Sequence, residues 1–514
     1  MVKRLAISLL LVIALAGGAF AQAVAGQGGI SGAVRDASGA SIPGAKVLVA
    51  NESKGIRRTL ESNEAGVFTA PALVPSSGYS VSVAKDGFAK WETKDFEILV
   101  GQTLNFNIVL EVAAAATQVE VTSVAPLVED TKTGVSQVVE KAQIDNLPIN
   151  GRRADTFVLL TPAVTNDGEF GLVSFRGIAG GNAFLTDGND TTQAYYNENA
   201  GRTRIATQIS QDAVQEFQVL SNGFSAEFGR ATGGVINTVT RGGSNSVHGT
   251  GYWFFRNRTL NAADRYANGV NMPEWRHQAG ASLGGPIKPD KVFYFMNFEM
   301  VRRNFPGLNR IINNNLSDGN NIIVPCTATA AQCATAIAFI NRQQNVLVPR
   351  SVESVMGFAK IDWRPTERNA FSFSSNVMHW KSPHGIQTQA VLTSGNMLGG
   401  NGNSTVETRY GKASWTSIPN NSSVNEFRFG WFKDRLSDPG ASDLFPAETG
   451  PLAISLSGSA IGAAQGYPRT QPSEMRFQFA DNLSWTRGAH SMKFGFDAST
   501  NKDFIDQLYN GSGG

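Results

Sequence analysis

Long segments in which apolar and polar residues alternate constrain this chain more than any other feature of its sequence. In Lys291–Met300 every second residue from Val292 is apolar, while Asn297 and Glu299 fall on the opposite face. The same alternation recurs in Glu426–Trp431, Met475–Phe479 and Met492–Phe496. A period of two predicts β-strands with one apolar face, as in a membrane-spanning β-barrel or a soluble sandwich. The length of the segments and their aromatic residues favour the barrel.

The first 21 residues have the three parts of a secretory signal peptide. Lys3 and Arg4 form a basic start, and residues 5–16 form an apolar run that is too short to span a bilayer. A small-x-small cleavage site ends at Ala21, so we expect the mature chain to begin near Gln22 and to leave the cytoplasm. The alternative is an uncleaved N-terminal membrane anchor.

Charge and reactive residues exclude several classes of function. The chain has 44 Lys+Arg against 42 Asp+Glu, and without Lys3 and Arg4 the two counts are equal. Proteins that bind nucleic acid carry a basic excess, so we expect no such partner. The segment Gly280–Gly284 has G-x-S-x-G spacing, but Pro286 follows it, where a nucleophile elbow needs a helix. The five histidines are scattered, so we expect no enzyme, no metal site and no cofactor.

Residues 27–111 predict a small antiparallel β-sandwich, because short alternating runs are separated by turn residues. These runs are Ile30–Arg35, Lys46–Ala50, Gly66–Thr69, Tyr79–Val83 and Leu104–Leu110. The region resembles the carboxypeptidase regulatory-like domain, a transthyretin-like sandwich with a carbohydrate-binding-like fold, although Ser76–Gly78 stands where that family more often has a Pro-Gly turn. The resemblance implies an accessory domain without zinc ligands, and hence no peptidase.

The central block, residues 118–243, carries a series of motifs in a fixed order. They are Leu147–Arg152, Leu159–Pro162, Phe175–Gly177, Phe184–Gly188, Ala213–Val219, Ala226–Arg230 and Gly233–Arg241. In this order they resemble the plug domain of TonB-dependent outer-membrane receptors, in the Oar-like subgroup that also carries the N-terminal sandwich. The resemblance extends from about residue 27 to residue 514 and implies a small α+β plug followed by an antiparallel transmembrane β-barrel over residues 244–514.

The resemblance also implies which residues hold the plug in place. Charged plug residues in this family face the polar barrel wall and form ion pairs with it, which here assigns that role to Arg176, Glu216, Arg230 and Arg241. The remaining motif residues of the candidate site are Gly177, Asp187, Gly188, Gly233 and Gly234. Plain surface charge is the alternative for each of the four. The carboxylates of Asp187–Asp190 lack the spacing of a calcium loop and predict a turn.

Residues 112–122 form a small-residue linker that ends in a short β-forming segment. Two interpretations of Val119, Glu120, Val121 and Thr122 stay open. By resemblance they are the TonB box, which adds as a strand to a TonB-like periplasmic energy transducer. Alternatively, they only tether the sandwich to the plug. A helix is expected just after this segment, with Val138, Val139, Ile144 and Leu147 on one face and its end before Pro148.

The barrel region has long polar loops, at Asn304–Asn321 and Pro383–Asn403, as expected on the outer side of such barrels. Cys326 and Cys333 fall beside the first loop and could brace it by a disulfide. We count about nine strands, whereas plugged receptors of this kind have about 22. We therefore expect an incomplete barrel, the N-terminal portion of a longer protein.

The alternating segments predict a mainly β protein, and the resemblance implies that it lies in the outer membrane, in contact with its lipid and with the N-terminal domain in the periplasm. The resemblance implies a receptor or transporter that takes up a large or scarce extracellular ligand, and the sandwich favours an oligosaccharide. The alternative is an Oar-type structural or surface-adhesion protein without active transport.

Overall fold

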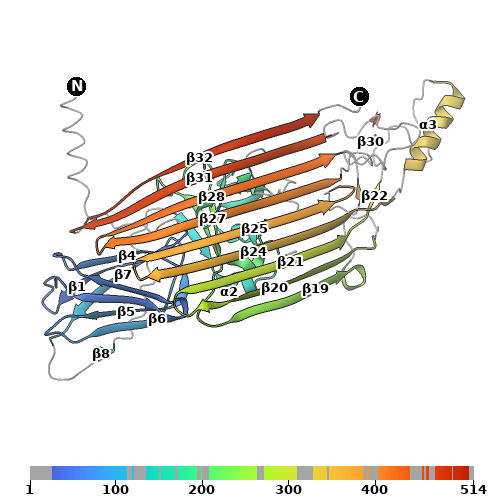
Figure 1. Cartoon of the computed structure of the whole chain (residues 1–514). Helices are drawn as coiled ribbons and strands as arrows, with labels where there is room; N and C mark the ends of the chain where they lie inside the picture. The colour runs from blue at the N-terminus through green and yellow to red at the C-terminus, as the bar shows by residue number, and fades with distance from the viewer. Residues whose placement is uncertain are drawn as a thin grey trace, which may run out of the picture.

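The computed structural model describes residues 26–112, 119–120, 135–149, 152–167, 172–193, 198–199, 208–262, 271–309, 328–343, 347–385, 391–392, 403–439, 454–456, 459–461, 469–488 and 490–508. They form an N-terminal sandwich, a plug over residues 135–240 and a sheet of long strands, which we call the wall (Figure 1). The signal-peptide residues, with the expected cleavage between Ala21 and Gln22, lie outside the described residues.

The sandwich consists of two sheets that enclose one apolar core. The first sheet has the order β4 (Val67–Leu73), β1 (Gly28–Asp36), β7 (Thr103–Leu110). The second has the order β3 (Ile56–Glu61), β2 (Lys46–Asn51), β5 (Ser76–Ala84), β6 (Trp91–Ile98), β8 (Val119–Glu120). A short 3₁₀ turn, η1 (Glu52–Lys54), joins β2 to β3. Alternate residues of both sheets, such as Ile30, Val47, Val81 and Ile108, point inward and are fully or almost fully buried, so the sandwich has a self-contained core.

The plug is built around a mixed five-stranded sheet. Its order is β14 (Asn189–Asp190), β13 (Ala183–Thr186), β18 (Val235–Thr240), β17 (Val214–Asn222), β9 (Val135–Val139). Around it lie β10 (Val164–Asp167), β11 (Leu172–Phe175), β12 (Ile178–Ala179), β15 (Thr192–Gln193), β16 (Glu198–Asn199), α2 (Lys141–Asn146), η3 (Ala154–Leu160) and η5 (Gln211–Ala213).

The helix expected before Pro148 is shorter than the spacing of the apolar residues predicts. α2 includes Ile144 and ends at Asn146, but Val138 and Val139 belong to β9. Val138 pairs with Gln218 and Val139 with Phe217 of β17. β-Branched residues favour a strand when a partner strand is available, and that partner is about 80 residues away in the sequence, beyond any local pattern.

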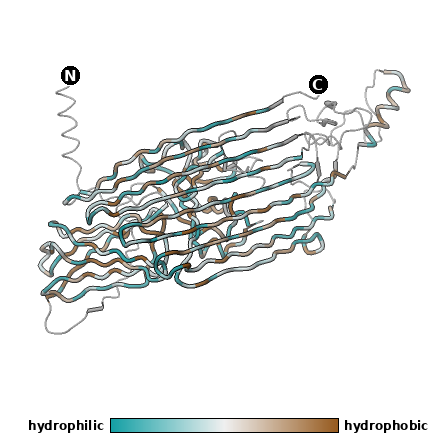
Figure 2. The backbone as a smooth tube through the Cα atoms, viewed as in Figure 1, coloured by the Kyte–Doolittle hydropathy of each residue, from teal (hydrophilic) through white to brown (hydrophobic). Residues whose placement is uncertain are grey.

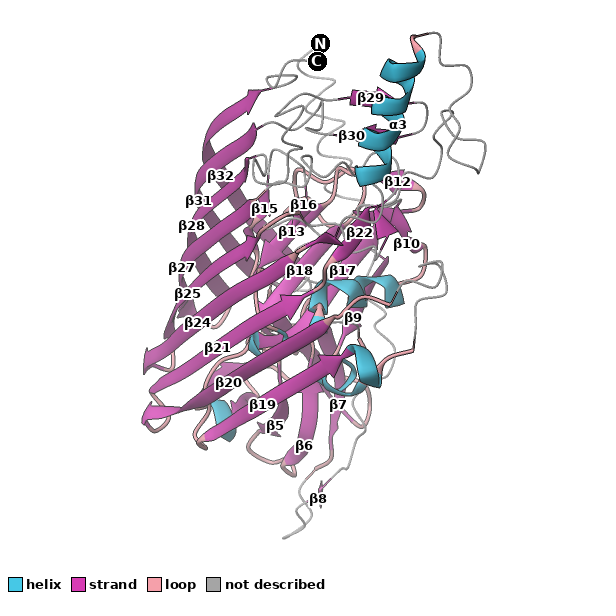
Figure 3. Cartoon of the chain, turned by 90° about the vertical axis from the view of Figure 1, so that its right-hand side faces the viewer, coloured by secondary structure: helices cyan, strands magenta, loops and turns pink. Residues whose placement is uncertain are grey.

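The wall is a nine-stranded antiparallel sheet in which each strand pairs with the next long strand of the chain. Its strands are β19 (His248–Asn257), β20 (Trp275–Lys288), β21 (Val292–Asn304), β24 (Ser351–Thr366), β25 (Asn369–Ser382), β27 (Ser404–Asn420), β28 (Ser423–Pro439), β31 (Arg469–Arg487) and β32 (His490–Leu508). Figure 3 shows the sheet curving around the plug strands β13, β17 and β18.

The expected alternation orients the central strands of the wall. In β21 Met296, Phe298 and Met300 are exposed on the outer face, while Asn297 and Glu299 are buried against the plug side. Figure 2 shows the alternation as short brown and teal segments along the strands. The segment Gly280–Gly284 lies inside β20, so the G-x-S-x-G spacing belongs to a strand.

Two groups of aromatic side chains, which we call the aromatic bands, lie on the outer face, one on β24, β25 and β27 and the other on β19 and β20. Near the sandwich, the Phe371 ring stacks with those of Trp363 and Trp415, with centroids 5.1 and 6.0 Å away. At the other end, rings including those of Trp253 and Trp275 surround His277. Through strand register the bands lie at the levels of Val292 and Asn304. Twelve residues of strand tilted by about 40° span about 30 Å, which matches the membrane-embedded zone of an outer-membrane barrel.

The end of the wall far from the sandwich carries short elements. They are β22 (Gly307–Asn309), β23 (Leu347–Val348), β26 (Val391–Leu392), β29 (Ile454–Leu456), β30 (Ser459–Ile461), η6 (Arg258–Leu260) and α3 (Ala330–Gln343). Cys333, in α3, is disulfide-bonded, and the chain's other cysteine, Cys326, lies outside the described residues. Among the described residues, no helix is long and apolar enough to cross a membrane.

Candidate functional site

The candidate site is the interface between the plug and the inner face of the wall, and the turn after β13 lies at its centre. Asp187 and Gly188 have positive φ angles of 47° and 78°, which produce the tight turn that the sequence predicts. The turn directs the buried segment Asn189–Gln193 against the wall. Hydrogen bonds to the end of β18 fix the Asp187 carboxylate: Thr240 donates its N–H at 2.8 Å and its hydroxyl at 2.7 Å.

Two lysines of the wall approach this turn. Lys360 Nζ of β24 lies 3.8 Å from Asp187 Oδ2, and it also donates to Thr240 Oγ1 at 3.0 Å. Lys412 Nζ of β27 donates to the Asp187 carbonyl oxygen. Burial alone would raise the pKa of Asp187, but the two lysines and the Thr240 hydrogen bonds outweigh it and lower the pKa. The carboxylate therefore stays ionised and ties the plug to two wall strands.

An arginine of the wall forms the second ionic contact. Arg476 Nη1 of β31 lies 3.0 Å from Asp190 Oδ1 and Nη2 donates to the Thr192 carbonyl at 2.9 Å, while the same guanidinium pairs with Glu474 of its own strand. The side chain of Arg476 is only 1% exposed. The other oxygen of Asp190 pairs with Arg230 of the plug at 3.0 Å. Asp190 thus joins plug and wall through a buried charge network.

A third group of contacts surrounds Glu299 of β21. Its carboxylate accepts hydrogen bonds from Ser210 of the plug at 2.8 Å and from Gln278 and Tyr252 of neighbouring wall strands. The guanidinium of Arg152, a plug residue, lies 4.3 Å from the centre of the Tyr252 ring and pairs with Asp212 at 3.1 Å. Polar wall residues therefore meet polar plug residues at several separate points.

Apolar contact complements these polar points. Four aromatic side chains on the inner face of the wall belong to the same buried cluster as the plug core: Phe295, Phe358, Tyr410 and Phe432. The plug is therefore held by a mixed interface of ionic, hydrogen-bonded and aromatic contacts.

The resemblance implies that four charged plug residues form ion pairs with the wall. Their contacts in the structure differ from this expectation. Arg176 donates to the plug carbonyls of Ser221 and Gly233, and Arg230 pairs within the plug with Asp190. Arg241 does reach the wall, but through the Phe295 ring, whose centroid is 5.1 Å from its guanidinium carbon. The assignment was wrong for Glu216, because β17 turns this side chain toward the sandwich, where Oε1 accepts the N–H of Val100 at 2.9 Å.

The motif glycines have structural roles inside the plug. Gly177 adopts φ 77° in the turn between β11 and β12. A Cβ on Gly234 would lie 2.5 Å from ring atoms of Phe175, and one on Gly233 would lie 2.2 Å from Asn182 Oδ1. Close packing at this place therefore requires glycine.

Sequence reasoning missed the wall partners, namely Lys360, Lys412, Arg476, Glu474 and Glu299. A signal for them exists, because each is a charged residue on the polar face of an alternating strand. Burial of a charge inside such a face marks a contact with another polar element. Among the residues that the structure describes, no group of three His, Cys, Asp or Glu side chains could hold a metal ion.

Half of the candidate TonB box lies within the described residues. Val119 and Glu120 form β8, which pairs in parallel with Trp91 and Glu92 at the edge of the sandwich sheet. Val121 and Thr122 lie outside the described residues. The backbone of this segment thus takes part in strand pairing, the kind of interaction that a TonB box makes with its partner.

Comparisons with known proteins match both ends of the chain. Residues 29–111 match the model of the carboxypeptidase regulatory-like domain, and residues 239–343 and 302–514 match that of the outer membrane beta barrel domain. The chain is 27% identical over 286 residues to the TonB-dependent transporter Oar of Myxococcus xanthus, a match that covers 52% of this chain and 26% of that protein.

Solved outer-membrane receptors have a similar arrangement at low identity. A variant of the ferric enterobactin receptor from Pseudomonas aeruginosa is 12% identical, with a TM-score of 0.48 over 74% of this chain and 50% of the receptor. The siderophore receptor PirA from Acinetobacter baumannii is 14% identical, with a TM-score of 0.47 over 73% of this chain and 49% of that receptor. The chain thus spans about a quarter of the curated relative and about half of these receptors.

Proposed function

Because this chain belongs to the outer membrane beta barrel domain family, we propose that it forms the plug-bearing part of a TonB-dependent receptor or transporter. It is an outer-membrane protein, and the sandwich lies at the periplasmic end of the wall. The transporter imports an extracellular ligand that is too large or too scarce for a simple pore.

The observation that carries this proposal is the polar character of the plug–wall interface. The plug is tied by Asp190 to Arg476, by Asp187 to Lys360 and by Ser210 to Glu299. Replacing a buried ion pair by apolar residues is often neutral or stabilising, so such pairs give position more than net stability. An interface of this kind keeps the plug in one place while leaving it able to move when it is pulled.

The pull reaches the plug through its edge strand. β9 is the outermost strand of the plug sheet and pairs with β17. It is also the first described plug strand after the candidate box at Val119–Thr122. A TonB-like energy transducer that adds a strand to the box would therefore apply force to β9 and separate it from β17, because strand addition binds the segment through several backbone hydrogen bonds.

The ligand that we propose is a large extracellular molecule, with an oligosaccharide as the first candidate. The match of residues 29–111 to the carboxypeptidase regulatory-like domain supports the carbohydrate class only indirectly, through the fold that this domain shares with carbohydrate-binding modules. Fluorescently labelled oligosaccharides are therefore the first probes to use.

A deletion in the full-length protein tests the proposal. Cells that produce the variant lacking Val119–Thr122 should lose energy-dependent uptake of the labelled oligosaccharide. A variant lacking Ala113–Ala116, which shortens the same linker equally, should retain it. Uptake that survives the first deletion would show that the box is not at Val119–Thr122. Absence of uptake in every strain, with loss of surface attachment when the gene is removed, would favour the adhesion function instead.

A further inference from the structure

The sandwich is attached to the segment that connects the plug to the wall. Asn245, just before β19, donates its backbone N–H to the Ser53 carbonyl at 2.7 Å and its side-chain amide to the Glu52 carbonyl at 2.6 Å. Lys54 Nζ donates to the Gly243 carbonyl at 3.0 Å. The η1 turn of the sandwich is therefore hydrogen-bonded to the segment that connects the plug to the wall.

A second attachment joins the sandwich to the plug sheet itself. The loop between β6 and β7 presents the N–H of Val100 to Glu216 of β17, at 2.9 Å. The next residue, Gly101, has φ 69°, a conformation that favours glycine, and the end of the Gln218 side chain lies against it, 1.8 Å from where a Cβ would stand. The sandwich thus contacts the strand from which β9 must be peeled.

A third set of contacts runs across the periplasmic turns of the wall. Arg364 Nη1, near the end of β24, donates to the Lys54 carbonyl at 2.6 Å. Asn63 Nδ2 of the sandwich donates to the carbonyl of Gly488, in the turn between β31 and β32, at 2.8 Å. Gln27 Nε2 donates to Glu426 Oε1 of β28 at 2.9 Å. The sandwich therefore extends beneath the described wall, from β24 to the last hairpin (Figure 1).

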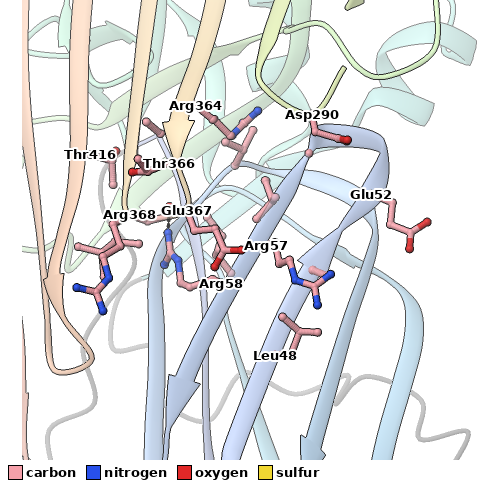
Figure 4. A pocket seen from close by; sticks show the side chains of 18 of the residues that line it. Leu48, Glu52, Arg57, Arg58, Asp290, Arg364, Thr366, Glu367, Arg368 and Thr416 are labelled. Carbon is pink, nitrogen blue, oxygen red and sulfur yellow. Dashed lines mark hydrogen bonds between the residues drawn. The ribbon is translucent and has the colours of Figure 1, made fainter. Parts of the chain in front are cut away.

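These contacts are separate points rather than a continuous apolar interface. The only apolar cluster of described residues that spans the boundary consists of Ala72 with Ile418 and Val424 of the wall. Beside it lies a cavity of about 1010 Å³, into which side chains from both sides project, among them Arg57, Arg58 and Arg368 (Figure 4). Polar interfaces of this kind are typical of domains that move relative to one another, and the sandwich keeps its own core when it detaches.

We propose that the sandwich is a second, periplasmic gate that must leave its place before the plug can move. The proposal rests on the function proposed above and adds a distinct step to it. The sandwich holds the plug sheet through Val100 and the plug–wall connection through Ser53, so movement of β17 or of Gly243 breaks these contacts. The candidate TonB box lies between the sandwich and the plug in the chain, so a pull on the box applies force to both.

Hydrogen–deuterium exchange on the purified full-length protein tests whether the contacts open together. Asn245→Ala removes the side-chain bond to Glu52 at one end of the interface. If the sandwich moves as one body, exchange should rise about two- to tenfold at the far end, at the Val100 amide that bonds to Glu216, because one hydrogen bond contributes that much to the docking equilibrium. The matched variant Asn420→Ala loses hydrogen bonds to Ser422 and Ser423 in another turn of the wall, and should leave exchange of the Val100 amide unchanged. Unchanged exchange of the Val100 amide in Asn245→Ala would overturn the gate.

A reversible cross-link tests the gate in cells. The double variant Ser53→Cys with Asn245→Cys places cysteines at two residues whose backbones are hydrogen-bonded, with the N and O atoms 2.7 Å apart, so that oxidation can join the sandwich to the plug–wall connection. The oxidised double variant should stop uptake of the labelled oligosaccharide, and dithiothreitol should restore it, while each single variant and the wild type remain active in both conditions. Equal uptake by the oxidised and reduced double variant would refute the gate proposal without contradicting the transporter proposal. If the wild type imports nothing, the transporter proposal fails, and the exchange experiment alone then tests the gate proposal.

Discussion

Arg476 is the residue on which the plug–wall charge network depends. Its guanidinium lies between Asp190 of the plug and Glu474 of its own strand, and it is almost completely buried. Arg476→Met removes the buried guanidinium that the carboxylates of Asp190 and Glu474 share, so we expect a loss of about 3–5 kcal/mol in the free energy of unfolding. Urea or heat unfolding of the purified protein measures the loss. Cleavage of the plug by trypsin serves as the readout of its unfolding.

Lys90→Met, in the sandwich, is the control for this prediction. Lys90 pairs with Glu92 at 3.5 Å, and the lysine side chain is about half exposed. Exposed pairs contribute about 0–1 kcal/mol, so the control should be nearly neutral. Equal effects of the two variants would mean that the Asp190 network does not hold the plug.

Glu216 gives the sandwich–plug contact a dependence on pH. Burial, together with the nearby carboxylates of Glu97 and Glu140, raises the pKa of this carboxyl from 4.5 to about 8, although the hydrogen bond from Val100 lowers it. A raised pKa means that docking is strongest when the group is protonated. The contribution is complete below pH 4.5 and is lost as the pH rises through about 8.

We therefore predict that exchange protection of the Val100 amide, relative to its intrinsic rate at each pH, falls at least about tenfold between pH 5 and pH 9. Glu216→Gln keeps an acceptor for the Val100 N–H but carries no proton to lose. Its protection should be independent of pH in this range. A wild type and a Glu216→Gln variant with the same pH profile would show that another group is responsible.

At the scale of one element, β21 tests where the membrane lies. Phe298 stands midway along its exposed face between the two aromatic bands, while Val292 lies at the level of Trp363. Arginine at the middle of the lipid-facing surface costs about 2–4 kcal/mol, and near the interface about 0–1 kcal/mol. Phe298→Arg should therefore destabilise the barrel much more than Val292→Arg in equilibrium folding into lipid vesicles. The reverse order would place the membrane elsewhere on the wall.

Prediction from sequence succeeded for elements whose pattern is local. The alternation in Lys291–Met300 and Glu426–Trp431 correctly assigned the outer and inner faces of β21 and β28, because strand period alone determines them. In the sandwich, β3 and β6 were not expected, since Arg57, Arg58 and the charges of Glu92–Asp95 obscure their alternation. Arg58 is buried because carbonyls of Pro71 and Ala72 accept its hydrogen bonds.

Pairing across long distances in the sequence lay beyond such patterns. The partner of Asp190 is 286 residues away at Arg476, and no local signal joins the two. Glu216 shows the same limit, because its neighbours predict a strand but not which side of that strand meets the sandwich. Charged residues on the polar face of a strand indicate a contact with another polar element. Which residues they contact is determined by the fold.

For the whole molecule, we propose that the plug closes a pore that would otherwise conduct. Single-channel recording in planar lipid bilayers tests this with the full-length protein and a variant lacking plug residues 135–240. We expect the wild type to stay closed and the variant to show a stable, large conductance. A wild type that already conducts, or a well-folded variant that inserts and stays closed, would contradict it.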